Sequence, residues 1–172
     1  MMLAAMLEDR QLRVQFAHGL ESSPQGSKAR LLAQHFAACT PEMNTRDFES
    51  CVGVHAGTLA RFRPTVLVGS SFGGAVAVAL LERGLWRGPT LLLAQAAIHY
   101  NPQARLPADA RVILVHARQD DVVPVEHSRL LAATAPGVSE LIECDDDHAL
   151  TGLVASGKLL ELVRRTAMLA GP

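Results

Sequence analysis

Gly69, Ser71 and Gly73 form the pattern Gly-x-Ser-x-Gly, in which a serine can serve as a nucleophile. The pattern is centred on Ser71, because centring it on the preceding serine would put larger residues where glycines are required. Such a serine lies on a sharp strand-to-helix turn, and a Cβ two residues to either side would collide with the neighbouring strand or helix. The spacing therefore predicts a nucleophile elbow at Ser71.

A serine hydroxyl becomes a strong nucleophile only when a nearby base accepts its proton, and a carboxylate must orient that base. His148 lies in a polar loop near the end of the chain, and Asp120 follows an apolar run that ends at His116. The chain order serine, acid, histidine is typical of hydrolases built around such an elbow. We expect Ser71, Asp120 and His148 to form a catalytic triad, with Asp121 as the alternative acid.

Negative charge develops on the carbonyl oxygen when a nucleophile attacks it, and backbone N–H groups must stabilise that charge. One amide is expected from Phe72, directly after the serine. The second is expected from Leu20, in the loop after the first apolar run, with His18 packed and hydrogen-bonded beneath that loop. The residues expected to border the substrate pocket follow the first and middle strands: Glu21, Ser22, Gln95, Ile98, His99 and Tyr100.

Short apolar runs alternate with longer segments of helical period, which favours an α/β fold with a mostly parallel sheet. Strands are expected at 12–17, 65–68, 90–94, 111–116 and 141–142, with an extended piece around Met43. Helices are expected at about 27–38 with Ser27 as the N-cap, and at 48–62, 75–83, 125–135 and 149–169. The carboxyl ends of parallel strands meet at one edge of a sheet, so this order can bring the three reactive residues together.

The composition indicates one globular domain spanning residues 1–172. Hydrophobic residues make up 49% of the chain and charged residues 19%, which supplies a core and excludes disorder as the main state. The formal net charge is -1 and there is no basic run, so a nucleic-acid partner is not expected.

Features of secretion and membrane insertion are not expected either. The three cysteines Cys39, Cys51 and Cys144 are an odd number without C-x-x-C spacing, which favours a reducing, cytoplasmic compartment over a disulfide framework. The first seven residues are apolar but lack the pattern of a secretory signal, and no apolar stretch is long enough for a membrane span.

Metal and cofactor sites are also weakly indicated. The three aspartates before His148, with Cys144, are candidate metal ligands, but contiguous residues rarely close a coordination sphere. Cys51 and His55 lie one helical turn apart without further partners, and no G-x-G-x-x-G follows a strand. We therefore expect no metal and no cofactor.

Four short motifs in one order resemble the α/β-hydrolase superfamily: His18-Gly19, Gly69-x-Ser71-x-Gly73, Asp120-x-x-Val123-Pro124 and Asp147-His148. The chain also looks like small lidless bacterial esterases, whose first strand ends in His-Gly-x-x-Ser-Ser-Pro before a Ser-Lys-Ala helix start, here residues 27–29. It departs from them at Ala117, where relatives often carry glycine. The resemblance covers nearly the whole chain and implies a three-layer domain without a cap, with an open active site and ester or thioester hydrolysis.

The residues thus favour a serine hydrolase that cleaves small to medium acyl esters through an acyl-serine intermediate. A thioesterase, an acyltransferase and a small serine peptidase use the same machinery and stay open as alternatives. A hydrolase-fold protein that binds a ligand or partner without turnover is the alternative from another functional class, because fold does not imply function.

Overall fold

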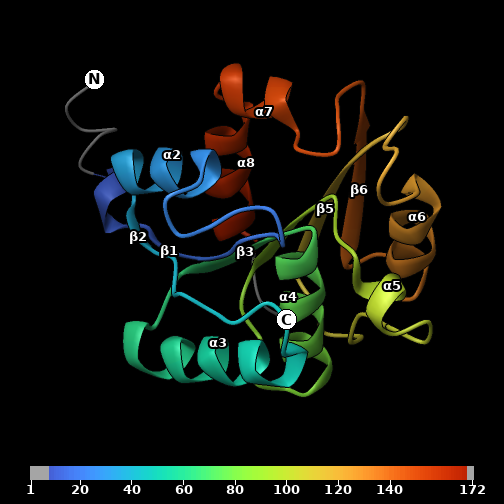
Figure 1. Cartoon of the computed structure of the whole chain (residues 1–172), viewed down its shortest axis with the longest axis horizontal. Helices are drawn as coiled ribbons and strands as arrows, with labels where there is room; N and C mark the ends of the chain where they lie inside the picture. The colour runs from blue at the N-terminus through green and yellow to red at the C-terminus, as the bar shows by residue number, and fades with distance from the viewer. Residues whose placement is uncertain (1–7, 170–172) are drawn as a thin grey trace.

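The computed structural model describes residues 8–169, which form three layers around one six-stranded sheet (Figure 1). The expectation about a secretory signal in the first seven residues lies outside the described part. All strand pairings are parallel, in the order β2-β1-β3-β4-β5-β6. The strands are β1 (Arg13–Ala17), β2 (Ala37–Cys39), β3 (Val66–Ser70), β4 (Thr90–Leu93), β5 (Val112–Ala117) and β6 (Ser139–Cys144).

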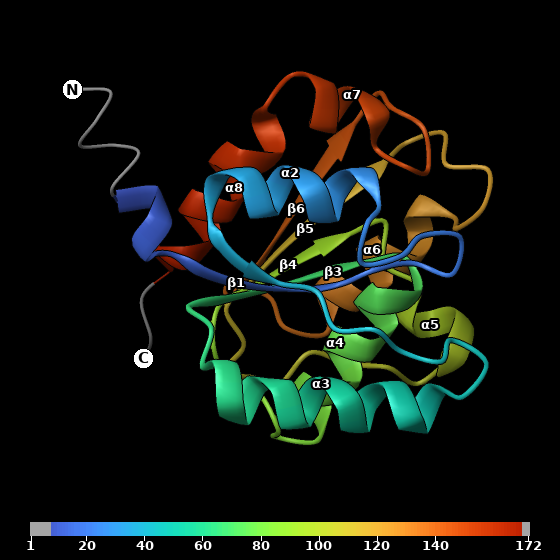
Figure 2. The ribbon, with the colours of Figure 1, turned by 60° about the vertical axis from the view of Figure 1, so that its left-hand side comes forward.

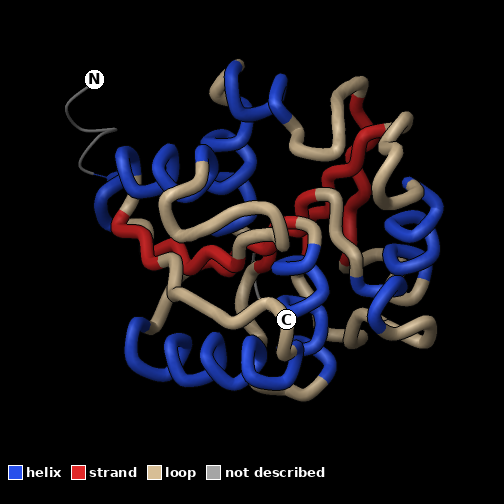
Figure 3. Tube along the Cα trace, viewed as in Figure 1, coloured by secondary structure: helices blue, strands red, loops and turns tan. Residues whose placement is uncertain are grey.

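Helices cover both faces of this sheet, as Figures 2 and 3 show. One face carries α2 (Ser27–His35), α7 (Thr151–Ala155) and α8 (Lys158–Ala167). The other carries α3 (Phe48–Phe62), α4 (Phe72–Glu82), α5 (Ala97–Tyr100) and α6 (Val125–Ala133). Because both faces are covered, the central strands are mostly apolar, and residues 66–68 of β3 are fully buried.

Alternate residues along each strand supply the two cores. Leu67, Leu92 and Leu114 pack against α3, α4 and α6, whereas their neighbours at 66, 68, 91 and 113 pack against α2 and α8. Helix α4 is apolar all round, since ten of its eleven residues are buried, as expected for a helix at the centre of a domain. The burial of α4 fixes the turn between β3 and α4 against the sheet.

Three sequence predictions near the first helix are wrong: its end, its N-cap and the place of the following strand. The helix ends at His35, because Phe36 is extended, and the edge strand β2 then forms at 37–39 instead of around Met43. Pairing with β1 decides this position, since Arg13 lies in register with Ala37. The N-cap is Gly26, and Ser27 is the first helical residue.

The end of the chain also differs from the prediction. Strand β6 is six residues long instead of two, because its polar residues lie along a half-exposed sheet edge and hide the strand pattern. The single helix expected at 149–169 is two helices, α7 and α8. Gly157 separates them with φ +76, a left-handed conformation that glycine adopts without steric cost.

The topology brings the loops after β1, β3, β5 and β6 to one edge of the sheet, where the predicted reactive residues lie. The chain between β4 and β5 forms only α5 and loop in the described structure, as expected for a domain without a cap. Among residues 8–169, no helix has both the length and the apolar character needed to cross a lipid bilayer.

Candidate active site

Ser71 occupies a strained turn between β3 and α4. Its φ of 53° and ψ of -115° lie outside the regions that L-residues favour, and such a conformation costs on the order of 1–3 kcal/mol. Its backbone is held from the sheet side, because its N–H donates to the carbonyl of Leu93 at 2.9 Å and its own carbonyl accepts from Ala96 at 3.1 Å. The strain is therefore fixed by the surrounding fold.

The glycines around Ser71 are required by close backbone contacts. A Cβ at Gly69 would lie 2.6 Å from the carbonyl oxygen of Gly73, and a Cβ at Gly73 would overlap the carbonyl of Ala17. Gly74 packs as tightly against Gln95. The predicted nucleophile elbow is thus present in geometry at the position that the sequence pattern indicates.

His148 lies between Ser71 and Asp120. Its Nε2 is 3.0 Å from Ser71 Oγ, and its Nδ1 is 2.7 Å from Asp120 Oδ2. An ionised carboxylate only accepts hydrogen bonds, so Nδ1–H donates to Asp120 and Nε2 is left to accept the serine proton. The structure therefore brings the three predicted residues together, and of the two candidate acids it places Asp120, not the exposed Asp121, against the imidazole.

Asp120 is held by more than the histidine. Its side chain is fully buried, and Oδ1 accepts the N–H groups of Val122 at 2.9 Å and Val123 at 2.8 Å. Burial by itself raises the pKa of this carboxyl, but the hydrogen bonds from His148, Val123 and Val122 outweigh that effect. The pKa of Asp120 consequently lies below its usual 3.8, and the group is a carboxylate at neutral pH.

The two residues whose amides are predicted to bind an oxyanion, Phe72 and Leu20, both lie near Ser71. Phe72 opens α4, where first-turn N–H groups lack intrahelical partners, and Leu20 lies in a turn closed by the Ser22 N–H on the Gly19 carbonyl. A Cβ at Gly19 would be 3.4 Å from Ser71 Cβ, which places this turn beside the serine. Neither amide donates a hydrogen bond to any residue that the structure describes.

His18 supports the same turn from below. It is 3% exposed, and its Nδ1 donates to the Gly19 carbonyl at 2.8 Å. This is the packing role expected for it, and the contact stiffens the loop that carries the Leu20 amide.

A pocket of about 330 Å³ opens over Ser71 and His148. Phe16, Leu20 and Val122 give it apolar walls, and the predicted pocket residues Glu21 and Ser22 also line it. Leu20 is 52% exposed and Val122 64%, so the pocket mouth is open to solvent.

Lys28 is a pocket residue that was not predicted from the sequence. Its Nζ donates to the carbonyl of Ala149 at 2.5 Å, which ties α2 to the residue after His148. Burial lowers the pKa of Lys28 below its usual 10.5, against the nearby carboxylates of Asp147 and Asp146, which raise it. The sequence places Lys28 at the start of the helix that follows the first loop, and this position could have suggested a pocket residue. The sequence did not show that this end of the helix reaches the loop that carries His148.

Four further residues were expected at the pocket, but Gln95, Ile98, His99 and Tyr100 are not among the residues that line it. The reason is that α5 turns the chain after β4 toward the α4 face. Gln95 is buried and donates to Ser128 Oγ at 3.0 Å. Tyr100 stacks on Phe48 at 5.4 Å, with its neighbour His99 against its edge, and Ile98 lines a separate surface hollow.

The aspartates before His148 have a structural use. Asp147 accepts hydrogen bonds from the N–H and the hydroxyl of Thr151, and Asp146 accepts the N–H groups of Gly152 and Leu153. These bonds cap α7 and shape the loop that presents His148. Within the described residues, no group of three or more His, Cys, Asp or Glu side chains is arranged so that it could hold a metal ion.

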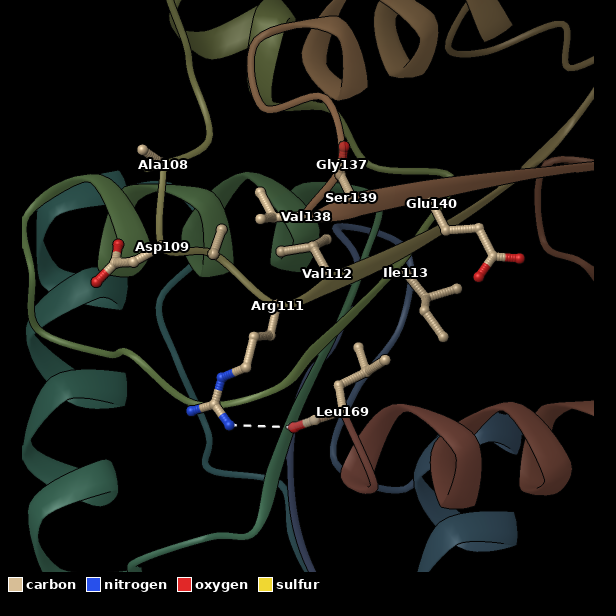
Figure 4. A pocket seen from close by; sticks show the side chains of 11 residues that line it. Ala108, Asp109, Arg111, Val112, Ile113, Gly137, Val138, Ser139, Glu140 and Leu169 are labelled. Atoms are coloured by element: carbon tan, nitrogen blue, oxygen red, sulfur yellow. Dashed lines mark hydrogen bonds between the residues drawn. The ribbon is translucent and has the colours of Figure 1, made fainter. Parts of the chain in front are cut away.

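Another hollow, of about 410 Å³, lies at the opposite ends of the strands (Figure 4). It is lined by the starts of β5 and β6, and Arg111 donates there to the carbonyl of Leu169 at 3.1 Å. Ser71 and His148 do not line it. The reactive groups are thus confined to the pocket at the carboxyl edge of the sheet.

No protein-family model and no curated protein matches the chain. Solved structures do resemble it. A YdeN-like hydrolase from Pectobacterium atrosepticum is 17% identical with a TM-score of 0.71, over 96% of this chain and 95% of that one. A hydrolase of the alpha/beta superfamily from Xanthomonas campestris is 21% identical with a TM-score of 0.66, over 90% and 98%. The esterase domain of a Rhodothermus marinus protein is 17% identical with a TM-score of 0.67, over 92% and 88%.

The TM-scores establish a common fold. At identities this low they do not establish a common activity, which has to be argued from the site itself. The sheet order, the elbow after β3 and nearly complete coverage of both chains all agree with the resemblance seen in the sequence. The chain therefore has the α/β-hydrolase fold, with a fully parallel sheet in the part that the structure describes.

Proposed function

We propose that the protein is a serine hydrolase that cleaves small to medium acyl esters through an acyl-serine intermediate. The observation that carries this proposal is the position of His148, whose two ring nitrogens lie 3.0 Å from Ser71 Oγ and 2.7 Å from Asp120 Oδ2. A buried carboxylate, an imidazole and a serine on a strained elbow are the parts that acyl transfer requires.

In the first half-reaction, Ser71 Oγ attacks the ester carbonyl while its proton passes to His148 Nε2. Asp120 stabilises the imidazolium through the Nδ1 hydrogen bond. The amides of Phe72 and Leu20 receive the negative charge on the carbonyl oxygen, an interaction worth on the order of 3–4 kcal/mol per donor. The imidazolium then protonates the leaving alcohol, and the acyl group stays on Ser71.

In the second half-reaction, His148 takes a proton from water, whose oxygen attacks the acyl carbon. The tetrahedral intermediate collapses, the Ser71 oxygen leaves with the proton from Nε2, and the carboxylic acid departs. The open pocket mouth between Leu20 and Val122 supports access of water to this intermediate. No step uses a metal or an organic cofactor.

The substrate class follows from the pocket. A volume of about 330 Å³ with walls from Phe16, Leu20 and Val122 suits an acyl group of small to medium length. The similarity to an esterase domain supports an ester substrate. The unpaired Cys39, Cys51 and Cys144 support a cytoplasmic location.

A fluorophosphonate probe tests whether Ser71 is activated. We expect the intact protein to gain the mass of the probe on Ser71 and to hydrolyse p-nitrophenyl butyrate. Ser71→Ala and His148→Ala should each lower kcat by at least about 10³-fold, because members of such a triad act as a unit. The free energy of unfolding should stay unchanged in both variants. His99→Ala, an exposed histidine away from the pocket, is the matched control and should keep wild-type activity.

The alternatives give different results in the same assays. A binding protein without turnover would leave Ser71 unlabelled. A thioesterase or an acyltransferase would label but prefer a thioester, or transfer the acyl group to an added alcohol or amine. A peptidase would label and cleave peptides faster than esters.

A further inference from the structure

His116 lies at the carboxyl end of β5 and contacts Asp120 in addition to His148. It is fully buried, and its Nε2 is 3.2 Å from Asp120 Oδ2 and 2.8 Å from the carbonyl of Val123. The same carboxylate oxygen thus receives two imidazoles, of which only His148 reaches Ser71. The serine mechanism proposed above has no use for the second one.

The hydrogen bonds around His116 have one consistent direction. Nε2 faces two oxygens that only accept, so it carries the proton. Nδ1 then accepts from the hydroxyl of Ser128 in α6 at 2.7 Å. That hydroxyl accepts in turn from the side-chain amide of Gln95 at 3.0 Å, and the Gln95 carbonyl oxygen accepts from the Ala97 N–H at 2.7 Å.

This chain of bonds reaches the nucleophile elbow. Gln95 precedes Ala96, whose N–H donates to the Ser71 carbonyl at 3.1 Å, and its Cβ fills the space beside Gly74. Asp120 and Ser71 are therefore connected twice. The first connection runs through His148, and the second runs through His116, Ser128 and Gln95, which are all fully buried.

We propose that His116 is a positioning residue, which with Ser128 and Gln95 fixes the Asp120 carboxylate relative to the elbow so that His148 fits between acid and serine. This inference rests on the proposed serine mechanism and adds residues to it. His116 touches neither Ser71 nor the pocket, so it acts only through Asp120.

A positioning group should not change its charge while His148 does. Burial lowers the pKa of His116, and this outweighs the opposing effects of the Val123 carbonyl and of Asp120. The ionisable groups that face it are Asp120, His148 and the β6 residue Glu143, which pairs with Arg129 of α6. His116 is therefore neutral at neutral pH, which agrees with an Nδ1 that accepts from the Ser128 hydroxyl.

Two substitutions of His116 separate positioning from general packing. His116→Leu removes both nitrogens, whereas His116→Gln keeps an N–H donor near the place of Nε2. His55→Leu is the matched control, because His55 is equally buried and lies under β1 in α3, bonded to Gln15. Since displacement of a catalytic group by about 1 Å can cost about 10²-fold, we expect His116→Leu to lower kcat by about 10- to 100-fold with KM nearly unchanged. His116→Gln should recover part of this loss, and His55→Leu should keep the wild-type kcat.

Two further readouts distinguish positioning from reduced stability. The rate of fluorophosphonate labelling should fall in parallel with kcat. The pH profile of kcat/KM should differ from that of the wild type in His116→Leu, because the Asp120 carboxylate has moved relative to the reacting groups. If the substitution only lowered the stability, the molecules that remain folded would keep the wild-type labelling rate and the wild-type pH profile.

Ser128→Ala covers the case in which His116→Leu does not fold, because it removes a single oxygen. We expect it to lower kcat by at least about threefold, whereas Thr166→Val, which also removes a buried hydroxyl, should change nothing. Wild-type kcat in folded His116→Leu, or in Ser128→Ala, would overturn the inference while the serine mechanism stands. A wild-type protein that neither labels nor turns over esters would instead overturn the proposed function.

Discussion

Replacing Asp120 by asparagine tests the triad without changing its shape. In the wild type, Oδ1 accepts two backbone N–H groups, from Val122 and Val123, and Oδ2 accepts the His148 Nδ1–H at 2.7 Å. Asparagine keeps one oxygen and puts an NH₂ in the other position. The outcome depends on which of the two positions the NH₂ takes.

The structure decides between the two orientations. An NH₂ at the Oδ1 position would face two backbone donors that cannot change. An NH₂ at the Oδ2 position faces two imidazoles, and His148 can adapt by moving its proton from Nδ1 to Nε2. A buried N–H left without an acceptor costs about 1–3 kcal/mol. The first orientation leaves two backbone N–H groups without one, whereas in the second His116 keeps its bond to the Val123 carbonyl, so the second orientation is favoured.

In that orientation, His148 presents an N–H to Ser71 and can no longer accept the serine proton. A triad with the wrong histidine tautomer loses about 10⁴-fold in kcat, which corresponds to about 5.5 kcal/mol in the activation barrier. We expect this loss for Asp120→Asn, measured with p-nitrophenyl butyrate, with little change in KM.

Asp121→Asn is the matched control, because Asp121 is adjacent, exposed and of the same type. It should keep wild-type kcat. The reasoning fails if Asp120→Asn retains more than about a tenth of the wild-type kcat, or if Asp121→Asn falls as far.

Two predictions concern stability. Gly157→Ala should lower the free energy of unfolding by about 1 kcal/mol, because alanine is strained at φ +76° although no atom crowds its Cβ. Gly53→Ala, whose Cβ would lie in open space within α3, should instead raise the free energy of unfolding. Urea unfolding of the two variants measures both changes. The bidentate hydrogen bond from Arg164 lowers the pKa of Asp9 below 3.8, so this pair stabilises the fold above that pH and the effect is lost as the pH falls through the lowered pKa. Asp9→Asn should therefore cost about 1 kcal/mol at neutral pH and progressively less as the pH falls below 3.8; an equal loss in both ranges would contradict this assignment.

The parts of the fold that could be predicted are those decided by local pattern. Strands β3 and β5 form at 66–70 and 112–117, close to the apolar runs at 65–68 and 111–116 that predicted them, and α3 forms at the predicted 48–62. The parts that could not be predicted depend on partners distant in sequence. Residues 37–39 become a strand because they pair with β1, and β6 is defined by its pairing with β5 and not by its own composition.

The same division applies to the site. Ser71, Asp120 and His148 could be predicted because their chemistry and order restrict the choice. The place of Gln95 could not, because a buried amide and an exposed one look alike in sequence. His116 was assigned only as the end of a strand, and its contact with Asp120 depends on how the loop after β5 folds back. Lys28 reaches the site only because α2 passes beside the loop that carries His148.

The two hydrogen bonds of His148 span 77 and 28 residues of chain, and they close only when β3, β5 and β6 have joined the same sheet. Such non-local assembly is slow compared with helix formation. The proposed ester hydrolysis should thus return late during refolding, after the helical circular-dichroism signal. Regained turnover would then report that β3, β5 and β6 have assembled into one sheet. A spectroscopic signal from a single helix or strand cannot report this.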